Sequence, residues 1–120
     1  VLQLGTHRQL FPDVGIIRDI TLLSKTLDTV VREEEIDMSK FNFLNIDVQG
    51  AELLVLQGAK ETLPMIDAVY TEINTEHVYK DCALISEIDD YLAAIGFGRV
   101  ATKFWRNHPW GDALYVRERK

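Results

Sequence analysis

The pattern of apolar and polar positions alternates along the chain between strand periodicity and helical periodicity. The run 42–48 is apolar on both faces of a predicted strand, through Phe43, Leu44, Ile46 and Val48. That pattern is typical of a strand in a parallel sheet that helices cover on each side. Residues 67–74, which read Asp-Ala-Val-Tyr-Thr-Glu-Ile-Asn after Pro64, predict a second buried strand. We expect the two strands to be parallel neighbours in one sheet.

Helical periodicity separates these two strands and returns after the second one. Residues 51–63 and 83–95 each carry their apolar side chains on one face, and Gly96 ends the second helix. Two further strands, at 98–105 and 112–118, surround a turn-rich segment and predict an antiparallel finish to the sheet. The order strand, helix, strand, helix, hairpin predicts an α/β fold with right-handed crossovers.

The first part of the chain has less regular patterns. Glycine and proline interrupt residues 1–15, which predicts a loop with room for one short turn of helix. Residues 16–23 are rich in Ile, Leu and Thr and predict a strand. Thr26 then offers an N-cap for a short helix that reaches about residue 35. Because Val1 opens a pattern typical of the middle of a domain, we expect residues 1–120 to be the C-terminal part of something longer.

The composition is that of a globular protein with one domain. Of the 120 residues, 47% are hydrophobic and 27% are charged, and no apolar run is long enough to span a bilayer. The formal net charge of -6 disfavours nucleic acid, whose phosphates attract clustered Lys and Arg. The single Cys82 excludes an intrachain disulfide, and no signal-like segment opens the chain. These features predict a cytoplasmic protein without a membrane or nucleic-acid partner.

Polar side chains gather where the two predicted buried strands end. Asp47 ends the first strand, and Glu72 and Asn74 end the second. Ligands of open parallel sheets bind beyond the carboxyl ends of the strands, so we expect these three side chains to converge on one crevice. Such a group can act as a general base, bind a substrate hydroxyl or hold a divalent ion. Capping of nearby backbone is the structural alternative for both acids.

Other candidate residues have a structural interpretation that competes with a functional one. The helical period points Glu52 toward the sheet, where its carboxylate can accept hydrogen bonds from free N–H groups at the helix start. His77 lies in the loop beyond the second strand, where an acceptor could approach, although a surface histidine is the more common case. His108 and Trp110 could wall a ligand pocket, but aromatic residues beside a hairpin more often cover the end of a sheet. The sequence has no zinc-binding pattern and no glycine-rich phosphate loop.

Several separate motifs resemble the FkbM-type methyltransferases in order and spacing. The motifs are Thr26-Leu27-Asp28, the run from Phe43 to Glu52, Leu56 with Gly58-Ala59, Glu72-Ile73-Asn74, Gly96-Phe97, and Trp110 to Val116. This resemblance covers nearly the whole chain. It implies the Rossmann-like sheet of the class I S-adenosylmethionine-dependent methyltransferases. Only the C-terminal half of that sheet is expected, because the family's glycine-containing cofactor loop and acidic ribose-binding position have no counterpart in this chain.

The resemblance also implies a reaction and the residues that serve it. Family members are associated with O-methylation of hydroxyl groups on sugars and polyketide-type natural products. By resemblance, Asp47 and the backbone of Val48 and Gln49 border S-adenosylmethionine, while Asp47, Glu72 or His77 serves the small-molecule hydroxyl acceptor. Because the half that holds most of the cofactor is missing, we expect the chain alone to bind S-adenosylmethionine weakly or not at all.

Two functions from other classes stay open at this point. A half sheet could be a non-catalytic assembly module, and the acids could belong to a carboxylate-metal hydrolase. In a truncated sheet, the strand over 42–48 would also have an unpaired edge, which is a template for pairing with another chain. We therefore expect a homo-oligomer in which this edge is covered, or a fold in which residues 16–23 cover it.

Overall fold

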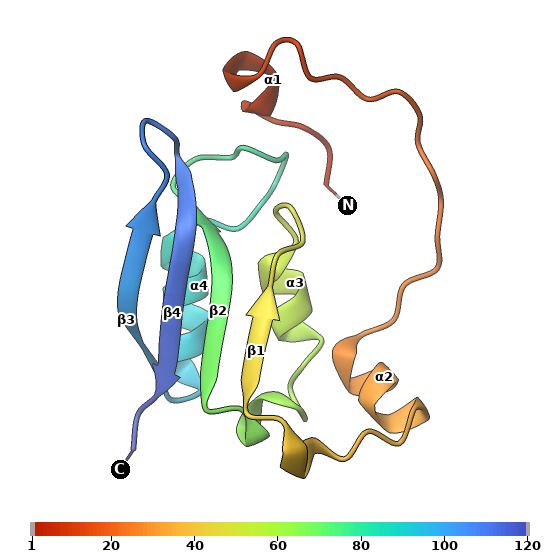
Figure 1. Cartoon of the computed structure of the whole chain (residues 1–120), viewed down its shortest axis with the longest axis vertical. Helices are drawn as coiled ribbons and strands as arrows, with labels where there is room; N and C mark the ends of the chain where they lie inside the picture. The colour runs from red at the N-terminus through yellow and green to blue at the C-terminus, as the bar shows by residue number, and fades with distance from the viewer. Residues whose placement is uncertain (1, 120) are drawn as a thin grey trace.

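Four strands form one mixed sheet in the order β1-β2-β4-β3 in this computed structural model, which describes residues 2–119. β1 (Phe43–Ile46) and β2 (Ala68–Asn74) are parallel, as the sequence predicted (Figure 1). β4 (Trp110–Arg117) is antiparallel both to β2 and to β3 (Phe97–Phe104), which confirms the antiparallel finish. The chain therefore has an α/β fold with a parallel pair at one side of the sheet.

The helices are short, and two of them pack on the sheet. They are α1 (His7–Leu10), α2 (Leu27–Glu33), α3 (Glu52–Gln57) and α4 (Ile85–Ala94), together with 3-10 turns at Met38–Lys40 and Leu63–Met65. No helix among residues 2–119 has both the length and the apolar character that crossing a bilayer requires. The Thr26 N-cap of α2 is confirmed, since its hydroxyl oxygen accepts a hydrogen bond from the Thr29 N–H at 3.2 Å.

α3 is shorter than the predicted helix over 51–63, and a long-range contact gives the reason. The carboxylate of Asp28, on α2, accepts hydrogen bonds from the backbone N–H groups of Glu61 at 3.0 Å and Thr62 at 2.9 Å. The Thr62 hydroxyl donates to the same carboxylate at 2.7 Å. These contacts hold residues 60–62 in a turn and fasten α2 to the rest of the domain.

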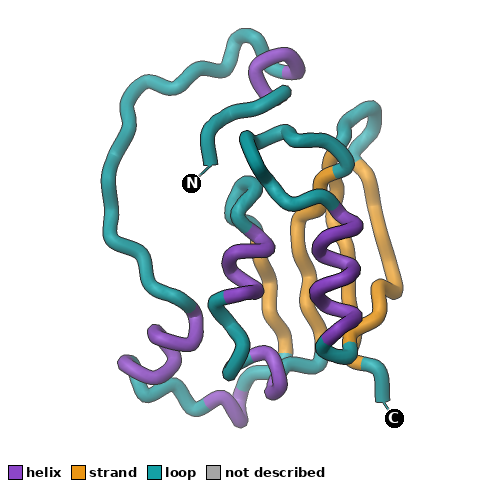
Figure 2. The backbone as a smooth tube through the Cα atoms, turned by 180° about the vertical axis from the view of Figure 1, so that it is seen from behind, coloured by secondary structure: helices purple, strands orange, loops and turns teal. Residues whose placement is uncertain are grey.

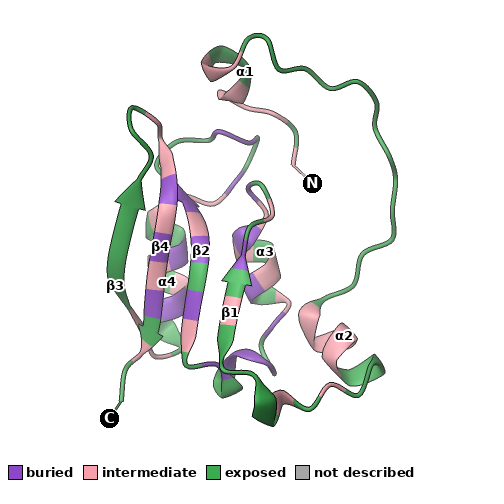
Figure 3. Cartoon of the chain, in the orientation of Figure 1, coloured by how far each residue is buried: buried purple, intermediate pink, exposed green. Residues whose placement is uncertain are grey.

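Helices cover only one face of the sheet, so the expectation of helices on each side is wrong for the described residues. α3 and α4 both lie on the same face, as the view from behind makes plain (Figure 2). On the other face, Phe43 is 54% exposed and Tyr70 and Val116 are each 37% exposed (Figure 3). The apolar residues on both sides of β1 therefore do not mean that both sides are buried.

The predicted strand over 16–23 is also wrong. These residues belong to a long exposed loop that runs outside the sheet from α1 to α2 (Figure 1). Ile17 is 99% exposed and Leu23 103% exposed, and neither residue pairs with β1. A strand needs a neighbour for its backbone hydrogen bonds, and strand propensity alone does not supply one. The outer edge of β1 has no strand partner among residues 2–119.

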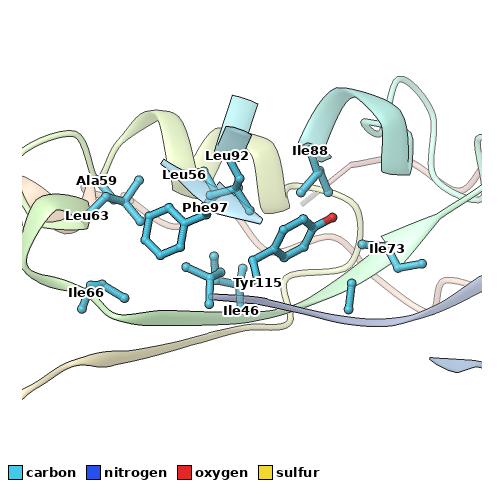
Figure 4. Packing of buried hydrophobic residues seen from close by; sticks show 12 residues of the cluster. Ile46, Leu56, Ala59, Leu63, Ile66, Ile73, Ile88, Leu92, Phe97 and Tyr115 are labelled. Atoms are coloured by element: carbon cyan, nitrogen blue, oxygen red, sulfur yellow. The ribbon is translucent and has the colours of Figure 1, made fainter. Parts of the chain in front are cut away.

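The core lies between the helices and the covered face of the sheet. Leu56 from α3 and Leu92 from α4 are completely buried and point toward Ile46 and Tyr115 on the strands (Figure 4). Phe97, at the start of β3, fills the space beside them. This packing fixes the positions of β1 and β2, and hence of the side chains that follow their carboxyl ends.

Candidate functional site

The turn after β1 contains two consecutive residues with positive φ, and one of them is a glycine. Gln49 has a φ of 55° and Gly50 a φ of 99°, so the chain passes through the left-handed region twice. A Cβ atom at Gly50 would lie 2.8 Å from the side chain of Tyr79. This close approach and the positive φ together require glycine. The turn brings the start of α3 directly under the carboxyl end of β1.

Glu52 holds this turn from inside. Its side chain is buried, with 2% exposure, and Oε1 accepts hydrogen bonds from the N–H groups of Val48 at 3.2 Å and Gly50 at 3.1 Å. The carboxylate thus faces the interior, as the helical period predicts, and it satisfies two backbone donors of the turn. The Val48 N–H group is therefore not free to donate a hydrogen bond to a ligand, because Glu52 already accepts it.

Glu72 is the carboxyl group whose chemistry the site changes most. It is half-buried near the end of β2 and lies opposite Asp112 of β4 in the sheet register. Burial raises the pKa of Glu72 from its ordinary 4.5 to about 7, and the negative charges of Glu52, Asp47 and Asp112 add to this effect. Glu72 is therefore poised to gain or lose a proton near neutral pH, and Asp47 lies close enough to influence it.

Asn74 completes the group of three side chains expected at the strand ends. It is fully buried, and neither atom of its side-chain amide has a hydrogen-bond partner within the described part of the chain. In the register of β2 and β4 it lies opposite Trp110. Buried amides without partners are uncommon in the interior of proteins. The Asn74 amide also lies close enough to Glu72 to oppose, in part, the rise of its pKa.

A chain of hydrogen bonds connects Asp47 with the loop after β2. The Tyr79 hydroxyl donates to Gln49 Oε1, and Gln49 Nε2 donates to Asp47 Oδ1 at 3.0 Å. Burial raises the pKa of Tyr79 to about 12, and the charges of Glu72, Glu52 and Asp47 contribute. Tyr79 therefore stays a proton donor at neutral pH and fixes the orientation of Gln49, which in turn orients the carboxylate of Asp47.

A small cavity lies against these side chains. Its volume is about 190 Å³, and it is lined by His7, Phe11, Gln49, Glu72, Val78, Tyr79 and Trp110. The first two residues come from the N-terminal segment, which pairs with the loop after β2. Leu4 forms a β-bridge with Tyr79, and the Gly5 N–H donates to the Val78 carbonyl at 2.8 Å. α1 is thereby held over the carboxyl edge of the sheet.

Aromatic rings make up much of the cavity wall. The rings of His108 and Trp110 are stacked, with centroids 4.2 Å apart and planes 16° apart. Phe11 packs against both of them, with its ring centroid 5.6 Å from that of Trp110. His7 lies 6.0 Å from the ring of Tyr79. The sequence favoured a structural role for Trp110, as a cover for the sheet end, over a role in a pocket wall, but in the structure Trp110 lines the cavity.

The structure brings together some of the predicted site residues and leaves others apart. Asp47 and Gln49 are hydrogen-bonded to each other, and Glu72 lines the same cavity as Gln49. His77 is exposed, its Nδ1 atom lies 3.0 Å from the Cys82 carbonyl oxygen, and it is not among the residues that line the cavity. The prediction that His77 serves the acceptor therefore stays a prediction without support from this geometry.

Sequence reasoning missed four lining residues, namely His7, Phe11, Val78 and Tyr79. The first two lie in a segment whose irregular pattern predicted only loop, and nothing in its local sequence indicates contact with a segment about seventy positions away. Tyr79 had a signal that was available in principle, because it closely follows the strand that carries Glu72 and Asn74.

The acids do not form a metal site in the described part of the protein. Among residues 2–119, no group of three or more His, Cys, Asp or Glu side chains is arranged to hold a metal ion. The carboxylate-metal hydrolase considered from the sequence stays a prediction without support from this geometry.

The fold and the site together define an α/β domain with acidic and aromatic side chains at the carboxyl edge of its parallel strands, where such domains bind small molecules. The methyltransferase FkbM domain matches residues 5–98, so the chain belongs to the FkbM methyltransferase family. The resemblance predicted from the separate sequence motifs is confirmed. No curated protein and no solved structure matches the chain.

Proposed function

We propose that the protein is an S-adenosylmethionine-dependent O-methyltransferase that acts on a hydroxyl group of a sugar or natural-product acceptor. Membership of the methyltransferase family supports the reaction class. The hydroxyl acceptor is inferred from Glu72, whose half-buried carboxyl group lines the cavity. Burial and neighbouring carboxylates raise the pKa of this group to about 7. A general base is most effective when its pKa lies close to the working pH.

The acidic edge of the sheet has the charge that the methyl donor would need. S-adenosylmethionine supplies, when bound, an electrophilic methyl group on a positively charged sulfonium. The carboxylates of Asp47, Glu52 and Glu72 lie at this edge, and their negative charge suits a cationic donor. Asp47 and Gln49 are exposed after β1, so their side chains are the ones available to border it. Val48 would contribute through packing more than through its N–H group, which Glu52 already binds.

Residues that line the cavity and the neighbouring Asp47, which is hydrogen-bonded to the lining residue Gln49, would together form the acceptor site. Ionised Glu72 would accept the proton of the acceptor hydroxyl as the oxygen attacks the methyl group. Asp47, held through Gln49 by Tyr79, would keep a fixed direction in which to accept a hydrogen bond from the acceptor. The rings of Phe11 and Trp110 would exclude water and pack against the apolar face of a sugar or polyketide.

A methyl-transfer assay with labelled S-adenosylmethionine tests the proposal. The complete enzyme that contains this chain is incubated with sugar and polyketide alcohols, and products are examined by mass spectrometry for one added methyl group on oxygen. Glu72→Gln, which keeps the shape of the side chain, should abolish most of the transfer, whereas Glu76→Gln at an exposed position nearby should not. Transfer to nitrogen or carbon only, or full activity in Glu72→Gln, would contradict the proposal.

A non-catalytic assembly module is the second candidate, and one observation favours it. The outer edge of β1 has no strand partner among residues 2–119, and the neighbouring Phe41 and Phe43 are 53% and 54% exposed. Such an edge can pair with a second copy of the chain. Sedimentation at micromolar concentration tests this: a dimer whose β1 amides are protected from hydrogen exchange supports pairing through the edge, and a monomer with fast exchange there rejects it.

A further inference from the structure

The cavity at the carboxyl edge has walls of a kind that attracts cations. Four of its lining side chains carry aromatic rings, namely His7, Phe11, Tyr79 and Trp110. They come from the N-terminal segment, the loop after β2 and the start of β4, so they approach the cavity from different directions. The face of an aromatic ring carries partial negative charge and binds ammonium groups, most strongly at Trp.

One carboxylate lines this cavity, and three more lie close to that carboxylate. Glu72 lines the cavity, and the charges of Glu52, Asp47 and Asp112 are close enough to raise the pKa of Glu72. None of the ion pairs found among residues 2–119 involves these four acids, and the one basic residue opposite any of them in the sheet register is Lys103, across from Asp112. Negative charge that stays uncompensated in a partly buried site favours a positively charged ligand.

We propose that this cavity binds an ammonium group of the methyl acceptor, so that the acceptor is an amine-bearing hydroxyl compound such as an amino alcohol or an amino sugar. This inference rests on the proposed function and narrows its substrate class. The volume of about 190 Å³ is smaller than the roughly 300–1,000 Å³ of sites that enclose drug-sized ligands, so it suits one small cationic group. The hydroxyl group of the acceptor would lie beside Glu72, and the remaining atoms of the acceptor would extend outside the cavity.

Two further features agree with an acceptor of this kind. His7 lines the cavity, and its buried Nδ1 atom has no hydrogen-bond partner within the described residues. An ammonium group beside Glu72 would favour the ionised carboxylate by direct attraction. Binding of the acceptor would in this way prepare the base that removes its proton.

A matched pair of small molecules isolates the contribution of the charge. Choline and 3,3-dimethylbutan-1-ol have the same shape and the same hydroxyl group, but only choline carries a positive charge. Titration of the protein with each compound is followed by NMR at the indole N–H of Trp110 and the backbone amides of Gln49 and Tyr79. We expect choline to bind about tenfold more tightly than the neutral alcohol. Equal affinities would overturn the proposal.

Matched variants locate the binding site. Trp110→Leu should lower the affinity for choline about tenfold, whereas Trp105→Leu, at an exposed position of the same hairpin, should leave it unchanged. Glu72→Gln should lower the affinity for choline by a similar factor without changing the shape of the cavity. If Trp110→Leu does not fold, the Glu72→Gln variant alone tests whether choline binds in this cavity. Choline binding that survives both Trp110→Leu and Glu72→Gln would place the cation elsewhere and overturn the proposal.

A competition experiment between choline and S-adenosylmethionine shows whether the cavity binds the acceptor or the methyl donor, because the donor is also positively charged. If S-adenosylmethionine displaces choline from the cavity, the cavity belongs to the sulfonium and the inference is wrong. If both bind together, the ammonium site belongs to the acceptor. Selective choline binding without methyl transfer to any hydroxyl compound would count against the proposed function while leaving the cation site in place, so the two failures can be told apart.

Discussion

The helix-covered face of the sheet and the carboxyl edge of its parallel strands differ in how well their polar groups are satisfied. Under α3 and α4 the contacts are apolar and tightly packed, as between Leu56, Leu92 and Tyr115. At the carboxyl edge, by contrast, several buried polar atoms have no hydrogen-bond partner. Every buried side-chain polar atom that lacks a partner within residues 2–119 belongs to Thr6, His7, Asn74 or His108, and all four residues lie around that edge.

The difference separates stability from chemistry within one small domain. Buried polar groups without partners reduce the free energy of unfolding, so they persist where a function needs them. The same edge holds the carboxyl group with the most unusual pKa, that of Glu72, while the covered face holds none of the acids that line the cavity. Substitutions at the edge should therefore change activity, and substitutions under the helices should change stability.

The largest effect is expected for Glu72→Gln. Loss of a general base lowers turnover by about a hundredfold or more. In the unchanged protein, turnover should fall as pH drops below about 7, the pKa to which burial and nearby carboxylates raise Glu72. The free energy of unfolding should show the opposite trend, because a raised pKa gives stability below pH 4.5 that is lost as pH rises through 7. Glu72→Gln should remove this loss, and thermal melts from pH 4 to 8 measure it.

The helix-covered face is tested with Leu56→Ala. This side chain has no exposed surface, and truncation should lower the free energy of unfolding by about 2–5 kcal/mol. Leu54→Ala on the same helix, at a residue that is 61% exposed, is the control and should change little. Denaturant titration compares the two variants. A cost at Leu54 as large as that at Leu56 would mean that both faces of α3 are buried in the protein.

Asp47→Asn should lower turnover about tenfold or more while the thermal melt stays the same. Asp47 is exposed and contacts Gln49 through a hydrogen bond that an asparagine carbonyl can also accept, so the fold does not depend on its charge. Kinetic constants and melting curves of the variant decide the matter. A large drop in melting temperature with unchanged turnover would show that Asp47 belongs to the scaffold.

Glu52 lies between the helix-covered face and the carboxyl edge of the sheet, so Glu52→Gln should affect both stability and activity. The variant should lose about 1–2 kcal/mol of unfolding free energy, because the charged acceptor of the Val48 and Gly50 N–H groups becomes neutral. It also removes one of the charges that raise the pKa of Glu72, so the pH profile of turnover should move to lower pH. A variant that loses activity at every pH without losing stability would reverse the roles of Glu52 and Asp47.

The smallest effect is expected for Asp28→Asn, at about 1 kcal/mol. Partial burial opposes ionisation of Asp28, but hydrogen bonds from Glu61 and Thr62 outweigh it and lower the pKa of this carboxyl group. A lowered pKa gives stability above the ordinary value of 3.8 that is lost as pH falls through the folded-state value. The difference between wild type and Asp28→Asn should therefore shrink in acid. Asp37→Asn, whose contacts are local, serves as control.

Periodicity predicted the elements that pack on one another. Alternation and helical spacing located β1, β2 and α4 to within a few residues, because each buries one side against the core. The same reasoning failed for residues 16–23, since strand propensity does not show whether a partner strand exists. It also placed helices on both faces of the sheet, because an apolar residue such as Phe43 does not show whether it is covered.

The site was predicted where it depends on strand ends and missed where it depends on contacts between distant segments. The positions of Asp47, Glu72 and Asn74 follow from the ends of two strands, and the charge of Asp47 contributes to the raised pKa of Glu72. The contact of Leu4 and Gly5 with the loop at Val78 and Tyr79 arises only in the folded chain. Local sequence patterns contain no information about such a contact.

Residues 12–26 form a long exposed loop, called the strap below, that connects α1 with α2 and limits how far the two can separate. The strap keeps the wall that carries His7 and Phe11 on the same molecule as the sheet, so its docking behaves as an intramolecular reaction at a high effective concentration. Exposed loops of this kind are where proteases cut most readily. A single cut there would leave the core between the sheet and its helices in one piece, yet half of the aromatic wall would become a separate peptide that dilution removes.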